Sequence, residues 1–75
     1  MDYVIPRSGS RVTLDIYDLN GRRVRRLVDG VLDAGVHRSA FDGRDDRGEK
    51  LAAGMFFARL SSGAEQRVTR FILLP

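Results

Sequence analysis

Eight glycines divide the chain of 75 residues into short segments, and this spacing constrains the fold more than any other feature. Most of the segments between them are about 5 to 12 residues long, which is too short for core helices and suits strands of ordinary length. The spacing therefore predicts an all-β chain that turns near Gly9, Gly21, Gly30, Gly35, Gly43, Gly48, Gly54 and Gly63.

The segment 11–18 carries the strongest strand signal, because apolar and polar residues alternate strictly along it. Successive side chains of a strand point to opposite faces of a sheet, so each set shares one face. The set expected toward the core is Val12, Leu14 and Ile16. The set expected on the opposite face is Thr13, Asp15 and Tyr17. We interpret Asp15, Asp18 and Asp29 as surface carboxylates, because no apolar pocket is evident around them.

A hairpin follows this strand. Asn20 and Gly21 form a dipeptide that tolerates positive φ, which tight hairpin turns require. Residues 22–29 then form the return strand. The apolar residues of that strand are separated by an odd number of positions, which predicts a β-bulge near Arg25–Arg26.

The rest of the chain predicts further short strands. They are expected at residues 3–5, 36–41, 54–60 and about 66–73, with a polar loop over 42–48. Phe41 and Phe56 are the expected core anchors. Turn signals at this spacing are typical of an antiparallel sandwich. We therefore predict one domain over 1–75, a small immunoglobulin- or fibronectin-III-like β-sandwich of six to seven strands with no helix.

The segment 12–24 reads VTLDIYDLNGRRV and resembles the "VtLxIYDxxGRxV" hairpin of bacterial C-terminal β-sandwich modules. These modules are the immunoglobulin-like domain of the flagellar hook-capping protein and the related sorting domains of type IX secretion. The resemblance continues through Leu27–Gly30, Ala34–His37, Phe41–Asp45, Gly48, Ala53–Phe57 and Arg70–Leu73. It covers nearly the whole chain. It implies an extracellular or periplasmic fold that serves anchoring, sorting or assembly rather than catalysis.

The resemblance also assigns structural roles to individual residues. The turns and core anchors that match the pattern are Asn20, Gly21, Phe41, Asp42, Gly43, Gly48, Gly54 and Phe56. Phe41 stands where the pattern usually has Trp, and Phe56 where it has Tyr, so both anchors lose a polar group. The chain ends at Leu74-Pro75, without the basic terminal residue that is usual in sorting domains.

The residue inventory offers little for catalysis. There is no Cys, which excludes a disulfide, a thiolate zinc site and a cysteine nucleophile. His37 is the single histidine, so no multi-histidine metal cage can be built. No apolar run approaches the roughly 20 residues that span a bilayer. We therefore expect no enzyme activity, no cofactor, no metal ion and no membrane insertion.

Thirteen basic residues against ten acidic ones give a net charge of +3, and the two signs are interleaved. The densest cationic segment contains Arg22, Arg23, Arg25 and Arg26. A nucleic-acid surface would pair such arginines with nearby aromatic residues for base stacking, and these are missing. We favour a solvated strand, or ion pairs to Asp15 and Asp29, and expect no nucleic-acid partner.

The loop over 42–49 holds the only acidic cluster, Asp42, Asp45, Asp46 and Glu49. Hard cations such as calcium take several carboxylate oxygens, which leaves a cation site open here. The spacing does not fit the calcium-loop pattern, and arginines interrupt the cluster. We favour a turn that is capped by Asp42.

What remains for function is the edges of the sheets. A sandwich this short has barely enough strands to enclose a core, and such folds complete themselves by accepting a strand from a neighbour. We predict a non-catalytic module that self-assembles into a bacterial cell-surface polymer such as a filament or tube, with copies of itself as partners. The expected contact residues are Tyr3, Val4, Ile5, Leu73 and Leu74. The alternative is a C-terminal sorting or anchoring domain attached covalently to a secreted passenger protein.

Overall fold

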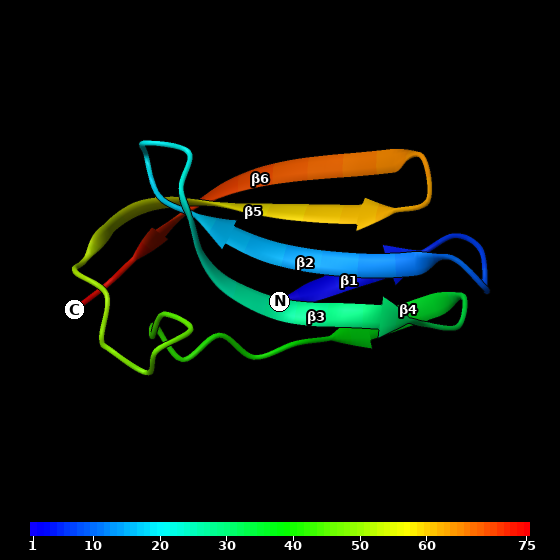
Figure 1. Ribbon diagram of the computed structural model, residues 1–75, viewed down its shortest axis with the longest axis horizontal. Helices are drawn as coiled ribbons and strands as arrows, with labels where there is room; N and C mark the ends of the chain where they lie inside the picture. The colour runs from blue at the N-terminus through cyan, green and yellow to red at the C-terminus, as the bar shows by residue number, and fades with distance from the viewer.

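The chain forms six antiparallel strands in two sheets and no helix, which confirms the predicted fold class (Figure 1). The computed structural model describes residues 1–75. The strands are β1 (Asp2–Ile5), β2 (Arg11–Tyr17), β3 (Arg23–Val31), β4 (Gly35–Arg38), β5 (Gly54–Ser62) and β6 (Glu65–Leu73). One sheet has the order β3-β2-β5-β6, and the other contains only β1 and β4.

The core lies where the small sheet faces the large one. The buried apolar side chains are Ile5, Val12, Leu14, Ile16 and Phe56. Three of these come from alternate positions of β2, which confirms the inward set that the alternation predicted. Because β1 is short and contributes only one of them, β2 supplies most of the enclosed core.

The β2–β3 hairpin contains the irregularity that the sequence predicted. Leu14 lies opposite Val28 and Asp15 lies opposite Arg26, so Leu27 is an extra residue on β3. A second register shift follows near the end of β2. Each bulge increases the local twist, and the two together bend β3 around the small sheet.

The turn of this hairpin is stabilised by the Asp18 side chain. Its carboxylate accepts hydrogen bonds from the backbone N–H groups of Asn20 at 2.9 Å and Arg22 at 3.0 Å. Within this turn only Gly21 has a positive φ, at 79°, and its N–H donates to the Asp18 carbonyl. Gly21 therefore meets the conformational demand of the turn, while Asn20 keeps an ordinary φ.

The strand expected over 36–41 ends early, at Arg38. Its partner β1 is only four residues long, and the strand pairing stops where Asp2, the first residue of β1, lies opposite Arg38. Phe41 lies beyond the strand and is half-buried, and its ring packs edge-on against Phe71 with 6.0 Å between centroids. Phe71 also stacks on Phe56. The aromatic anchors thus meet one another although Phe41 is not in a strand.

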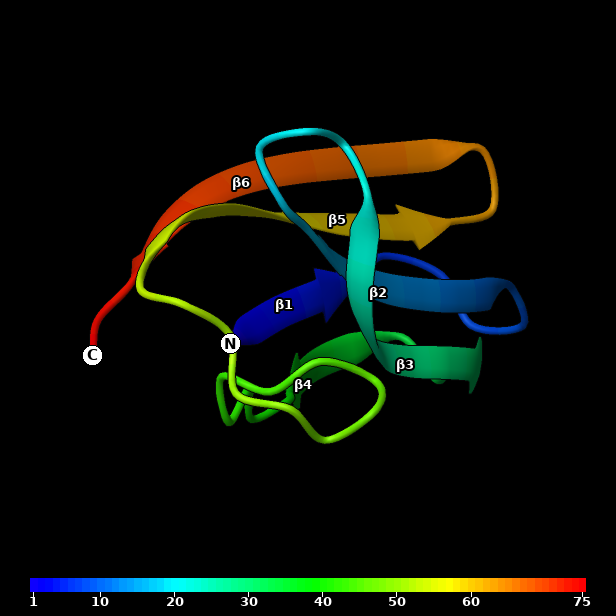
Figure 2. The ribbon, with the colours of Figure 1, turned by 60° about the vertical axis from the view of Figure 1, so that its left-hand side comes forward.

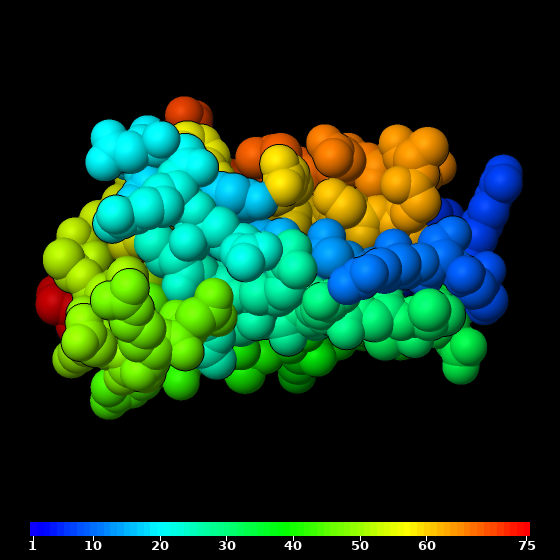
Figure 3. All heavy atoms as spheres, in the orientation of Figure 1, coloured from blue at the N-terminus to red at the C-terminus, as the bar shows by residue number.

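The loop after β4 packs along the outer edge of β3. The Asp46 N–H donates to the Val24 carbonyl, and the Asp46 carboxylate accepts from the Arg26 N–H at 3.0 Å. Figure 3 shows the yellow-green loop lying against the cyan start of β3. Gly43 is buried with a φ of 77°, and a Cβ there would meet Leu73 at 3.5 Å. The loop therefore protects an edge that would otherwise offer unpaired backbone groups.

The small sheet covers only half of the large one. In Figures 1 and 2, β1 and β4 lie across β2 and β3, whereas no strand lies over the same face of β5 and β6. There Phe41 covers only the end that carries Phe56 and Phe71. The pairing and chain order match strands B, C, C′, E, F and G of immunoglobulin-like sandwiches. No strand occupies the place that strand A takes beside strand B, which corresponds to β1.

Candidate functional site

The uncovered half of the sandwich forms a groove between β1 and β6, which we call the open groove. Its volume is about 910 Å³. Its apolar floor comes from the inner face of the large sheet, with Leu14, Ala58, Leu60 and Phe71. The other lining residues are Met1, Asp2, Tyr3, Val4, Pro6, Ser62, Glu65, Gln66, Arg67 and Thr69. The floor is part of the same sheet face that builds the core, and Leu14 belongs to both.

Two unpaired strand edges border the open groove. β1 pairs only with β4, and β6 pairs only with β5. The free edge of each strand carries backbone N–H and C=O groups that another strand could complete. β6 is nine residues long, which makes it a long edge for a chain of this size. The groove thus combines an apolar floor with hydrogen-bonding rims, the arrangement that accepts added strands.

Exposed valines continue the apolar surface beyond the groove. Val4 on β1 is 62% exposed and Val68 on β6 is 61% exposed. Val36 lies directly opposite Val4 on β4 and is also exposed. On β6, Ile72 is exposed beside Met55 of β5. The two strands that border the groove therefore carry apolar residues on their outer faces as well.

The predicted contact residues fall into two groups. Tyr3 and Val4 line the open groove. Ile5 is 1% exposed and belongs to the core of its own chain, so it is not free to contact a neighbour. Leu73 is half-buried and packs against Gly43, while Leu74 is exposed beyond the end of β6. Of this set, the structure brings only Tyr3 and Val4 together at the groove.

Sequence reasoning missed the groove residues on β6. Arg67 and Thr69 share the inward parity of Phe71, yet both are polar and exposed. A strand whose inner face changes from apolar to polar along its length is covered at one end only. This change of character was the available signal that half of the sheet has no second layer.

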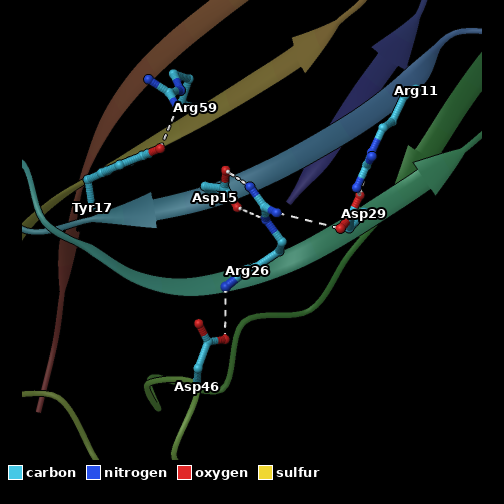
Figure 4. A network of polar contacts seen from close by, with 7 residues as sticks. All are labelled: Arg11, Asp15, Tyr17, Arg26, Asp29, Asp46 and Arg59. Atoms are coloured by element: carbon cyan, nitrogen blue, oxygen red, sulfur yellow. Dashed lines mark hydrogen bonds and ion pairs between the residues drawn. The ribbon is translucent and has the colours of Figure 1, made fainter.

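The opposite face of the large sheet carries a polar network instead (Figure 4). Asp15 is 1% exposed, so its interpretation as a surface carboxylate was wrong. Its two oxygens accept from Arg26 at 2.8 and 3.1 Å. Arg59 lies directly opposite on β5, where its guanidinium covers the Tyr17 ring and donates to the Tyr17 hydroxyl. These long side chains exclude water from the carboxylate, which explains why a residue on the outer face is buried.

Most arginines of the cationic segment 22–26 form ion pairs, as one interpretation of the sequence proposed. Arg26 pairs with Asp15, and this hydrogen bond raises the pKa of the guanidinium above its usual value. Asp29 also faces Arg26, at 3.5 Å. The hydrogen bond from Arg11 lowers the pKa of Asp29. Most of these charges are thereby committed to structural contacts within the sheet.

The acidic loop uses its carboxylates as acceptors for the backbone. Asp42 accepts from the Arg44 N–H, which lowers the pKa of Asp42, and Arg25 pairs with the same carboxylate at 3.1 Å. Asp45 accepts from the N–H groups of Arg47 and Glu49. No three acidic or histidine side chains converge as a metal ion would require. The loop is built as a sequence of capped turns.

The arrangement of the chain includes no helix with the length and hydropathy to cross a membrane. The sequence model of the FlgD Ig-like domain family matches residues 1–65, which is most of the chain. No curated protein and no solved structure matched. The matched region contains β1 to β5 and therefore both layers of the sandwich.

Proposed function

The chain belongs to the FlgD Ig-like domain family, and on this premise we propose that it is an assembly module of a bacterial surface structure. Domains of this family are typically non-catalytic β modules, and the family indicates a flagellar or bacterial surface context. The proposed activity is association with neighbouring copies through added strands. Repeated association of this kind would build a polymer such as a filament or tube.

The open groove is the single observation that supports this function best. Its apolar floor is continuous with the core, and exposing such a face costs about 25 cal/mol for each Å² that a partner would remove from water. Its rims are the free edges of β1 and β6. A strand that enters the groove gains both backbone pairing and apolar burial, which is the physical basis of β-augmentation.

Light scattering and negative-stain electron microscopy of the purified chain test the proposal. We expect particles larger than one chain at micromolar concentration, and Thr69→Arg should reduce their size because it adds a second long cation beside Arg67 in the groove. Thr13→Arg is the matched control, since Thr13 lies on the outer face of β2. A chain that stays monomeric at high concentration contradicts the proposal and favours a sorting or anchoring domain that serves an attached passenger.

A further inference from the structure

The two free edges that border the open groove lie on the same side of the sandwich, one in each layer. β1 and β6 run in opposite directions in Figure 1. Each sheet ends there, but the small sheet ends two strands earlier than the large one. The open side therefore has the profile of a step, with one layer projecting and the other recessed.

From this step we propose that the open groove is filled by the same surface of a second copy, which forms a two-fold symmetric sandwich. The inference rests on the proposed assembly function and specifies its first step, a closed pair of copies. Because an isologous interface is closed, growth into a polymer would use surfaces outside the open groove. A two-fold axis parallel to the strands places β6 of the second copy beside β1, in the antiparallel direction. The same rotation places β1 of the second copy beside β6. Both free edges are then paired at once, as an isologous interface requires.

This arrangement also covers the apolar floor. Beyond β1, the small sheet continues with β6 and β5 of the second copy, which lie over β5 and β6 of the first. Leu60 on β5 of one copy then faces β6 of the second, and Phe71 on β6 faces β5 of the second, across the usual sandwich spacing of about 10 Å. A single foreign strand would pair with one edge and leave half of this floor in water. The two-strand width of the open face therefore favours a second copy over an isolated peptide.

Side-chain complementarity specifies the register. Outer-face residues of β1 must lie beside outer-face residues of β6, so Val4 can lie opposite Val68 of the second copy. This register pairs two valines that are each about 60% exposed. It also places Asp2 opposite Arg70 of the second copy. Opposite charges and apolar pairs are the favourable cross-strand neighbours in a sheet.

Cysteine cross-linking tests the interface, because the chain has no cysteine of its own. Val4→Cys and Val68→Cys chains are mixed and oxidised, and the products are separated without reductant and identified by mass spectrometry. We expect a disulfide between position 4 of one chain and position 68 of the other. Each variant chain carries a single cysteine, so every disulfide that forms joins two chains.

A mixture of Val36→Cys with Val68→Cys is the matched control. Val36 is more exposed than Val4 (76% against 62%) but lies one strand farther from the groove, so its cross-linking should be at least about tenfold slower. Equal rates for the two mixtures, or a faster link between two copies of Val68→Cys, would overturn the inference. The proposed function fails separately, when light scattering finds only monomers. Larger particles without the 4–68 link leave assembly intact and refute this geometry.

Discussion

The two halves of this sandwich share one continuous sheet but differ in what covers its inner face. In the closed half, β1 and β4 cover β2 and β3, and side chains such as Val12 and Ile16 are completely buried. In the open half, the same face continues over β5 and β6 as the floor of a groove. Antiparallel strand pairing runs through both halves of the large sheet, with bulges only in the β2–β3 pair. The comparison teaches that strand pairing defines the sheet, whereas the second layer decides where the sheet is a core and where it is a surface.

The largest expected effect comes from truncating one leucine in each half. Leu14 and Leu60 are direct cross-strand partners, but Leu14 is 3% exposed while Leu60 is only half-buried. We expect Leu14→Ala to lower the free energy of unfolding by about 3 kcal/mol, because the enclosed site cannot collapse. Leu60→Ala should cost about 1 kcal/mol in the isolated chain, since much of that side chain already contacts water.

Urea denaturation at low protein concentration measures both values. Equal losses would mean that the two halves are equally enclosed, and the comparison would fail. Repeating the titration at high protein concentration also tests whether a second copy covers the open half. If a second copy covers the groove, the cost of Leu60→Ala should increase with concentration, while the cost of Leu14→Ala stays more nearly constant.

A smaller effect is expected on the outer face, where burial comes from charged side chains rather than a second layer. Asp15→Asn removes the carboxylate that accepts two hydrogen bonds from Arg26. We expect a loss of about 2 kcal/mol, because a buried polar partner is left incompletely satisfied. Thermal unfolding followed by circular dichroism measures the change.

The double variant Asp15→Leu/Arg26→Met is the control for this prediction. Replacing both members of a buried pair with apolar residues of similar size is often neutral or stabilising. The double variant should therefore be more stable than Asp15→Asn alone. If it is less stable, the pair contributes more than the cost of burying its charges, and the outer face is a second core in its own right.

The sequence was sufficient to predict the strands, apart from the early end of β4, because alternation and turn chemistry act locally. One bulge near Arg26 followed from the parity of the apolar residues on β3, whereas the second, near the end of β2, did not. The burial of Asp15 did not follow, because alternation identifies a face but not what lies over it. That burial depends on Arg26 and Arg59, which come from two different neighbouring strands. Only the assembled sheet places both of them beside the carboxylate.

The open groove was beyond the sequence for a related reason. Sequence reasoning anticipated free edges and named Tyr3 and Val4, which do line the groove. It could not specify which half of the large sheet the short β1–β4 sheet would cover, since that choice depends on the loop connections between layers. The polar residues Arg67 and Thr69 on the inner face of β6 signalled that part of this face is uncovered, but they do not specify which strands the short sheet covers.

The smallest expected effect is a dependence of stability on pH through the exposed ion pairs of the covered half. The hydrogen bond from Arg11 lowers the pKa of Asp29 in the folded chain. A carboxyl with a lowered folded pKa stabilises the fold above its unfolded pKa of about 4, and this contribution is lost as the pH falls through the folded value. We therefore expect Asp29→Asn to be less stable than the unmodified chain near pH 7, with a difference that shrinks below about pH 4. Melting temperatures of the two chains measured between pH 2 and 7 test this. If their difference stays constant across that range, the Arg11–Asp29 ion pair makes no pH-dependent contribution to stability. Solvent screening would then offset the attraction of the pair, although its atoms lie 2.6 Å apart.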